Sequence, residues 1–71
     1  MGMMITGRQI REARILLGWD QEALSLRANV DEEIIRRAEA RDSTPSITLV
    51  QAGRLQQILE RAGVRFGRMA R

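Results

Sequence analysis

The chain has 71 residues and a formal net charge of +3, and it contains neither cysteine nor histidine. A domain of this size buries only about 60% of the surface of its unfolded chain, so a dimer or a tight partner would help to stabilise it. The composition provides no disulfide, no thiolate ligand and no imidazole, which is the commonest metal ligand and general base. No metal-binding loop, glycine-rich phosphate loop or nucleophile paired with a base is present either. The sequence therefore predicts a protein that is not an enzyme and that binds no metal or cofactor.

The basic residues are all arginine, and they are distributed unevenly along the chain. Residues 1–20 carry a net charge of +1, residues 21–42 carry −2 and residues 43–71 carry +4. A basic balance favours nucleic acid as a partner. The opening sequence MGMMITGRQI is apolar only briefly before it reaches arginine, which fits neither a signal peptide nor a membrane span. We therefore expect a cytoplasmic protein without a membrane partner.

The first predicted helix covers residues 7–17. Thr6 and Gln9 have the spacing of a capping box, and Ile5 can pack against Ile10 across the cap. Gly18 ends the helix because glycine permits a left-handed turn. The apolar positions expected to face inward are Ile10, Ala13, Leu16 and Leu17.

Two short helices are predicted next, with a tight turn between them. Asp20 is a good N-cap for a helix that ends at Ala28. Asn29 tolerates positive φ, so it can stand in the turn. Asp31 is predicted to cap a third helix that extends to about Ala40, with Val30 packing against Ile35.

The last predicted helix begins after Thr48, which has capping-box spacing to Gln51, and extends to about Ala62. Gly63 ends it, residues 64–66 favour a short extended segment, and residues 67–71 form a basic tail. The whole chain, 1–71, is predicted to be one all-helical domain with an ordered core over residues 5–66. The inward apolar positions of the last helix are Leu55, Ile58, Leu59 and Ala62.

Two short helices joined by a tight turn describe a helix-turn-helix. From Gln21 onward, the sequence QEALSLRANVDEEIIRRAEA resembles the Cro/lambda-repressor-like, or XRE, helix-turn-helix family, and the resemblance covers nearly all of residues 5–66. It implies a small all-α bundle of four to five helices, with a short C-terminal strand. It also implies a sequence-specific transcriptional regulator that binds double-stranded DNA as a homodimer on a palindromic operator. The chain leaves room for no ligand-sensing domain, so no small-molecule ligand is expected. A DNA-binding antitoxin would share these features.

The resemblance also assigns roles to residues. It implies a structural ion pair between Arg14 and Glu39. Arg41 stands where the family often has glycine, which would lengthen the third helix. The last helix and the segment after it are our prediction for the dimer surface, through Leu59, Val64 and Phe66. The expected DNA-binding residues are Gln21, Asp31, Glu32, Glu33, Arg36, Arg37, Arg41, Ser43 and Thr44.

The third helix opens with three acidic residues, where DNA would favour basic ones. In a functional interpretation, Arg36 and Arg37 contact guanine or phosphate, while Glu32 or Glu33 accepts a hydrogen bond from the cytosine amino group. In a structural interpretation, the acids favour the helix dipole and form the i,i+4 pairs Glu32–Arg36 and Glu33–Arg37. The two interpretations are compatible. A different class of function also stays open, in which the acidic helix is a protein-interaction module for a basic partner.

Overall fold

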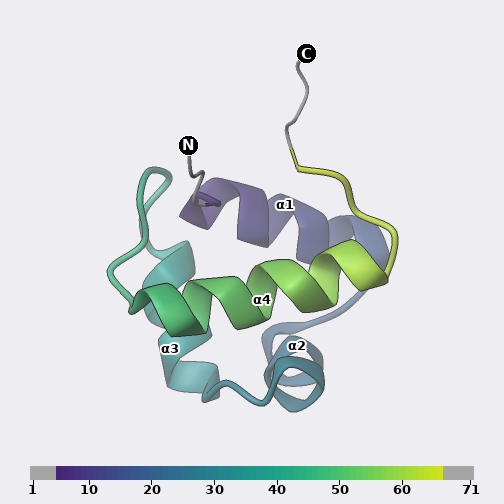
Figure 1. Ribbon diagram of the computed structural model, residues 1–71, viewed down its shortest axis with the longest axis horizontal. Coiled ribbons are helices and arrows are strands. Elements are labelled where there is room, and N and C mark those ends of the chain that lie inside the picture. Colours follow the sequence, from purple (N-terminus) through teal and green to yellow (C-terminus); the bar gives the residue numbers. More distant parts are fainter. Residues whose placement is uncertain (1–4, 67–71) are drawn as a thin grey trace.

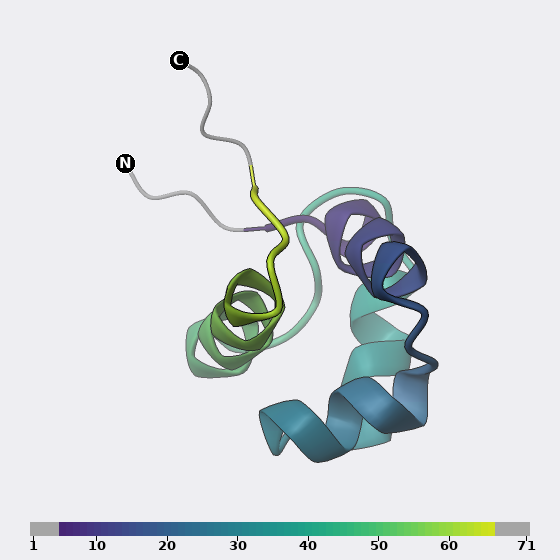
Figure 2. The same ribbon diagram turned by 90° about the vertical axis from the view of Figure 1, so that its right-hand side faces the viewer.

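The computed structural model describes residues 5–66, and within this range the chain forms four helices and no strand. They are α1 (Gly7–Leu17), α2 (Gln21–Ala28), α3 (Glu32–Glu39) and α4 (Leu49–Arg61). Figures 1 and 2 show α1 and α4 running alongside each other, with α2 and α3 closing one side of the bundle. The predicted all-α bundle is thus confirmed.

The helix starts follow from local hydrogen bonds that the sequence specifies. The Thr6 hydroxyl accepts from the Gln9 backbone N–H at 3.1 Å, and the Gln9 side chain accepts from the Thr6 N–H at 2.8 Å. Thr48 and Gln51 repeat both bonds, at 3.1 and 3.0 Å. Each capping box satisfies two backbone donors that a helix start otherwise leaves unpaired. Both helices therefore begin where the sequence predicts.

The core takes large apolar side chains from all four helices. Each fully buried Leu or Ile stabilises the fold by about 1.5–3 kcal/mol relative to its exposed state. Partly buried side chains cover the core's edges, among them Trp19, Ile58 and Phe66. The largest fully buried side chains are those of Ile10, Leu24, Ile35, Leu55 and Leu59.

Two side chains predicted to face the core do not lie in it. Leu16 is 78% exposed, because it falls on the side of α1 that faces the chain after α4 rather than α2 and α3. Ala62, which ends α4, is exposed as well. The buried apolar stripes of α1 and α4 are therefore narrower than the spacing of their apolar residues suggests.

The chain after α4 does not form the predicted strand. Gly63 has a φ of 109°, and the Val64 N–H donates to the Leu59 carbonyl at 3.0 Å, which ends the helix. A strand needs a hydrogen-bonded neighbour, and the part of the chain described here offers none. The predicted basic tail, 67–71, lies outside the described residues. Between residues 5 and 66, no helix is both long enough and apolar enough to cross a membrane.

Candidate nucleic-acid interface

Polar residues define both ends of α2, including the turn that joins it to α3. The Asp20 carboxylate accepts from the Ala23 N–H at 2.8 Å and caps α2. Asn29 takes the left-handed conformation, with φ 56°, as its place in the turn predicts. The Ser25 hydroxyl donates to the Val30 carbonyl across the turn at 2.6 Å. Sequence reasoning did not identify this hydrogen bond.

The start of α3 differs from the prediction. Asp31 stands at the N-cap position, and its backbone carbonyl accepts from Ile34 at 3.0 Å and Ile35 at 3.3 Å. Its side chain makes no capping hydrogen bond, so the prediction that the carboxylate caps α3 is wrong. The carboxylate instead extends the exposed acidic surface at the start of α3.

The outer face of α3 is organised around Arg36. Its guanidinium lies 2.7 Å from Glu33 and 3.9 Å from Glu32, and its side chain is 54% exposed. The predicted Glu32–Arg36 pair is therefore long, and the predicted Glu33–Arg37 pair is replaced by Glu33–Arg36. Among residues 5–66, no salt bridge includes Arg37, which is exposed. One arginine is thus held by two acids while its neighbour projects from the helix.

Behind this face, a buried ion pair fixes α3 against α1. Arg14 donates to both carboxylate oxygens of Glu39, at 2.8 and 2.9 Å, and to the Trp19 carbonyl at 3.0 Å. The hydrogen bond to Glu39 raises the pKa of Arg14 further above its ordinary value. The pair that the family resemblance implies is therefore present, in bidentate form, with the Glu39 side chain only 5% exposed. It ties the end of α3 to the end of α1.

Gln21 joins the same cluster, which bears on its expected role at DNA. Its side-chain amide donates to the Glu39 carboxylate at 3.1 Å, and the residue is half-buried. The first residue of α2 is therefore positioned by the buried carboxylate at the end of α3. A contact between Gln21 and DNA would have to use its carbonyl oxygen or backbone, or break this hydrogen bond.

Two contacts between α1 and the end of α3 were missed by sequence reasoning. Arg11 donates to the Glu39 backbone carbonyl at 3.0 Å and to the Asp42 carboxylate at 2.8 Å, and the latter bond lowers the pKa of Asp42. Gly7 is buried so closely that a Cβ there would overlap the carbonyl oxygens of Ala38 and Arg41. In the sequence, the only indications of these two contacts are the positive charge of Arg11 and the absence of a side chain at Gly7.

The loop after α3 carries three of the expected DNA-binding residues, Arg41, Ser43 and Thr44. All three are exposed, and the loop is tied to α1 by the Gly7 N–H, which donates to the Ser43 carbonyl at 2.9 Å. The prediction that Arg41 lengthens the third helix is wrong, since α3 ends at Glu39. The close approach of Gly7 holds the chain here in a loop. In Figure 1 this loop and α3 lie together at one end of the molecule.

The residues predicted for the dimer surface differ in their exposure. Leu59 is fully buried in the core, so its side chain is not available to a second subunit. Val64 and Phe66 are partly exposed and pack against the edge of the core. The part of the prediction that concerns Leu59 is therefore wrong, and the other two residues remain candidates.

Comparison with known proteins adds one finding to this geometry. A family model described as helix-turn-helix matches residues 10–52, which is more than half of the chain. The matched range begins in α1, includes α2, α3 and the loop after them, and ends in the first turn of α4. No curated protein and no solved structure matches the chain.

Proposed function

Because the chain belongs to the XRE-type, Cro/lambda-repressor-like helix-turn-helix family of DNA-binding domains, we propose that it is a sequence-specific transcriptional regulator that binds a palindromic operator as a homodimer. The observation that carries this proposal is the exposed outer face of α3, held at a fixed angle by the buried Arg14–Glu39 pair. In a helix-turn-helix, the second helix enters the major groove and its outward side chains read base edges.

The exposed arginines supply the attraction for DNA. Arg37 projects from α3, and Arg41 stands in the loop beyond it, where Ser43 and Thr44 add hydroxyl donors. Arginine matches the O6 and N7 acceptors of guanine in bidentate geometry, and hydroxyl groups contact phosphate oxygens. Together these residues can position the domain along the DNA backbone and read at least one base pair.

The acidic residues of α3 set a threshold for binding. Glu32 and Glu33 hold Arg36 in the free protein, and their own charges repel phosphate. Arg36 can turn to a base only where its contact with that base is at least as favourable as the two contacts with Glu32 and Glu33 that it gives up. A glutamate released in this way can accept a hydrogen bond from a cytosine amino group. We infer that α3 binds random DNA weakly and binds more tightly where both Arg36 and the released glutamate find partners on the bases.

In a homodimer, the second subunit provides a second α3 that contacts the other half of the operator. Equivalent reading helices must lie about 34 Å apart to enter successive major grooves on one face of the duplex. The described part of one subunit measures 32 × 23 × 19 Å. Two copies side by side around a twofold axis can therefore separate their α3 helices by this distance, and the operator would then be palindromic.

Selection from a pool of randomised duplex DNA tests the proposal. Wild type should enrich a palindrome, and the logarithm of its affinity for that sequence should fall linearly with the logarithm of the salt concentration. The double change Arg36→Ala, Arg37→Ala should abolish the enrichment, since each bidentate contact to guanine contributes about 1–3 kcal/mol of discrimination. The control Arg61→Ala, at an exposed arginine of α4 outside the α2–α3 unit, should enrich the same palindrome.

Two outcomes would contradict the proposal. Enrichment that survives the loss of Arg36 and Arg37 would show that α3 does not read the DNA. If wild type enriches no sequence and binds duplex only weakly, the acidic start of α3 is better explained as a docking surface for a basic protein. The exposed carboxylates of Asp31, Glu32 and Glu33 are what favour that second function.

A further inference from the structure

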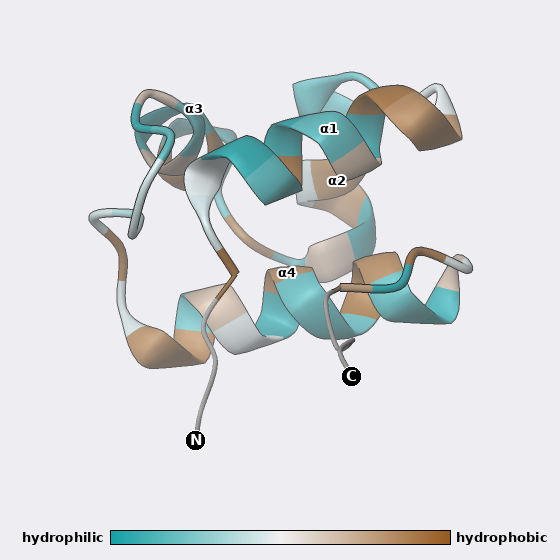
Figure 3. Ribbon diagram, turned by 90° about the horizontal axis from the view of Figure 1, so that it is seen from above, coloured by the Kyte–Doolittle hydropathy of each residue, from teal (hydrophilic) through white to brown (hydrophobic). Residues whose placement is uncertain are grey.

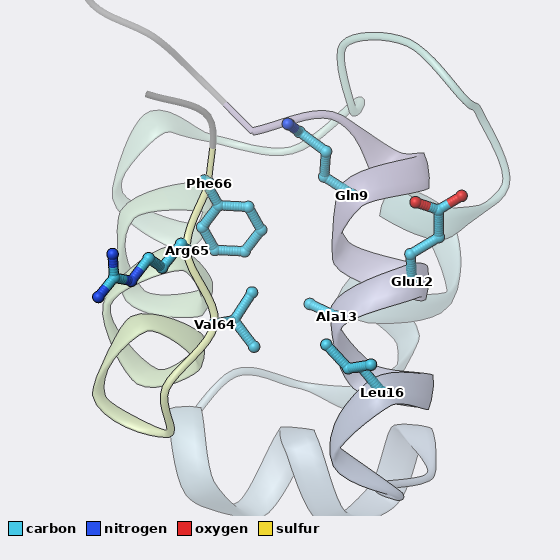
Figure 4. Close-up of a pocket in the computed structure, with 7 residues that line it drawn as sticks. All are labelled: Gln9, Glu12, Ala13, Leu16, Val64, Arg65 and Phe66. Atoms are coloured by element: carbon cyan, nitrogen blue, oxygen red, sulfur yellow. The ribbon is translucent and has the colours of Figure 1, made fainter. Parts of the chain in front are cut away.

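A groove runs between α1 and the chain after α4, away from the face proposed for DNA. Its volume is about 360 Å³, and the residues that line it belong to α1 and to residues 64–66. Figure 4 shows Val64 and Phe66 on one side, facing Ala13 and Leu16 on the other. No residue of α2 or α3 is among those that line it. A molecule in this groove would therefore leave the outer face of α3 open.

Beside this hollow stands an exposed apolar protrusion. Leu16 lines the groove and yet is 78% exposed, and the adjacent Ile15 is 63% exposed. Figure 3 shows the apolar end of α1 to which both residues belong. Exposed large apolar side chains next to an apolar hollow mark an interaction surface more often than isolated ones do. A protrusion and a hollow on the same face can also fit each other when two copies meet.

The rims of the groove carry opposite charges. Glu12 lines the groove on the α1 side and Arg65 on the other side, and Figure 4 shows both charged ends directed away from the hollow. Glu12 pairs with Arg8 at 2.9 Å, but both side chains are more than 60% exposed, so water can readily replace that contact. In a twofold arrangement, Glu12 of each copy can face Arg65 of the other, and the same pair forms twice. This is the self-complementarity that an isologous interface requires.

We propose that this groove is the subunit interface of the homodimer, with Leu16 of each copy inserted into the groove of the other. The proposal deepens the function proposed above, since it names the surface through which the two DNA readers are joined. It retains Val64 and Phe66 as interface residues, replaces Leu59 with Leu16 and adds the Glu12–Arg65 pair. The second copy is favoured as the occupant because the hollow and the apolar protrusion lie on one face of this chain, with an acidic residue on one rim and a basic residue on the other.

Sedimentation equilibrium of wild type and two matched variants tests the interface. Leu16→Arg places a charge in the groove, while Leu26→Arg makes the same change on α2, where Leu26 is 76% exposed and lies outside the groove. Wild type and Leu26→Arg should associate from monomer to dimer with the same constant, and Leu16→Arg should stay monomeric with an unchanged circular dichroism spectrum. A monomeric wild type at submillimolar concentration, or a dimeric Leu16→Arg, would overturn the proposal.

Charge reversal gives a second test that does not depend on the apolar contact. Glu12→Arg and Arg65→Glu should each weaken association by about tenfold or more, because like charges then face each other across the interface. The double reversal restores opposite charges and should return the association constant to near the wild-type value. A double variant that associates no better than either single variant would show that these two residues do not meet.

The interface and the DNA-binding function fail in different ways. Leu16→Arg should bind a duplex with one half-site as tightly as wild type but lose the extra affinity for two half-sites. A wild type that dimerises as expected but binds neither duplex would refute the regulator and leave the interface standing. If Leu16→Arg keeps the full affinity for two half-sites, the interface is refuted and the DNA reader stands.

Discussion

Loss of the Glu39 charge should strongly destabilise the described part of the molecule. In Glu39→Gln, the side chain keeps its size, but the Arg14 guanidinium, 15% exposed, loses the carboxylate that lies 2.8 Å away. Removing one partner of a buried pair costs about 3–5 kcal/mol, and because Arg14 keeps some exposure, we expect a loss of about 3 kcal/mol. A domain of this length has about 4–11 kcal/mol of total stability, and a loss of this size should lower the midpoint of thermal unfolding by about 12–24 °C.

Urea unfolding followed by circular dichroism measures this loss. The matched control is Glu33→Gln, which breaks an ion pair of similar length, 2.7 Å, whose side chains are 64% and 54% exposed. Exposed ion pairs contribute about 0.2–1 kcal/mol to stability, so the control should hardly change the urea concentration at the midpoint of unfolding. Adding Arg14→Gln to Glu39→Gln should cost less than Arg14→Gln alone, because no charge is then stranded. A loss below about 1 kcal/mol for Glu39→Gln would refute the reasoning.

Three further predictions use the same contrast between closely related positions. Gly7→Ala should lower the free energy of unfolding in urea by about 3 kcal/mol or more because its Cβ has no room, whereas Gly53→Ala, which meets open space in α4, should raise it by about 0.5–1 kcal/mol. Similar effects at the two sites would contradict this packing. Asp20→Ala should lower the free energy of unfolding in urea by about 1 kcal/mol because the cap of α2 is lost, and Asp31→Ala, which breaks no side-chain cap, should lower it much less. Equal losses would show that Asp31 caps α3 in solution. Glu33→Gln should raise the affinity for random duplex DNA in a fluorescence-anisotropy titration by freeing Arg36, and an unchanged affinity would exclude the proposed threshold.

The sequence determined by itself the features that depend on residues near each other in the chain. Capping boxes span three residues, and the left-handed turns at Gly18 and Asn29 depend on the conformational freedom of single residues. The helices therefore begin and end close to their predicted boundaries. The Arg14–Glu39 pair is a long-range contact, and only the family resemblance supplied it, because no local rule joins residues 25 positions apart.

Tertiary structure alone decided which neighbour each side chain meets. Leu16 has the spacing of a core residue, but it lies exposed beside a groove because the chain after α4 turns back along that side of α1. The pairing of Glu33 with Arg36 instead of Arg37 is by contrast local, since side chains three and four residues apart on one helix compete for the same partner. The need for glycine at position 7 arises only when the end of α3 packs against α1. Local hydrogen bonds place the helices along the chain, but packing between distant segments determines which surfaces remain free to bind.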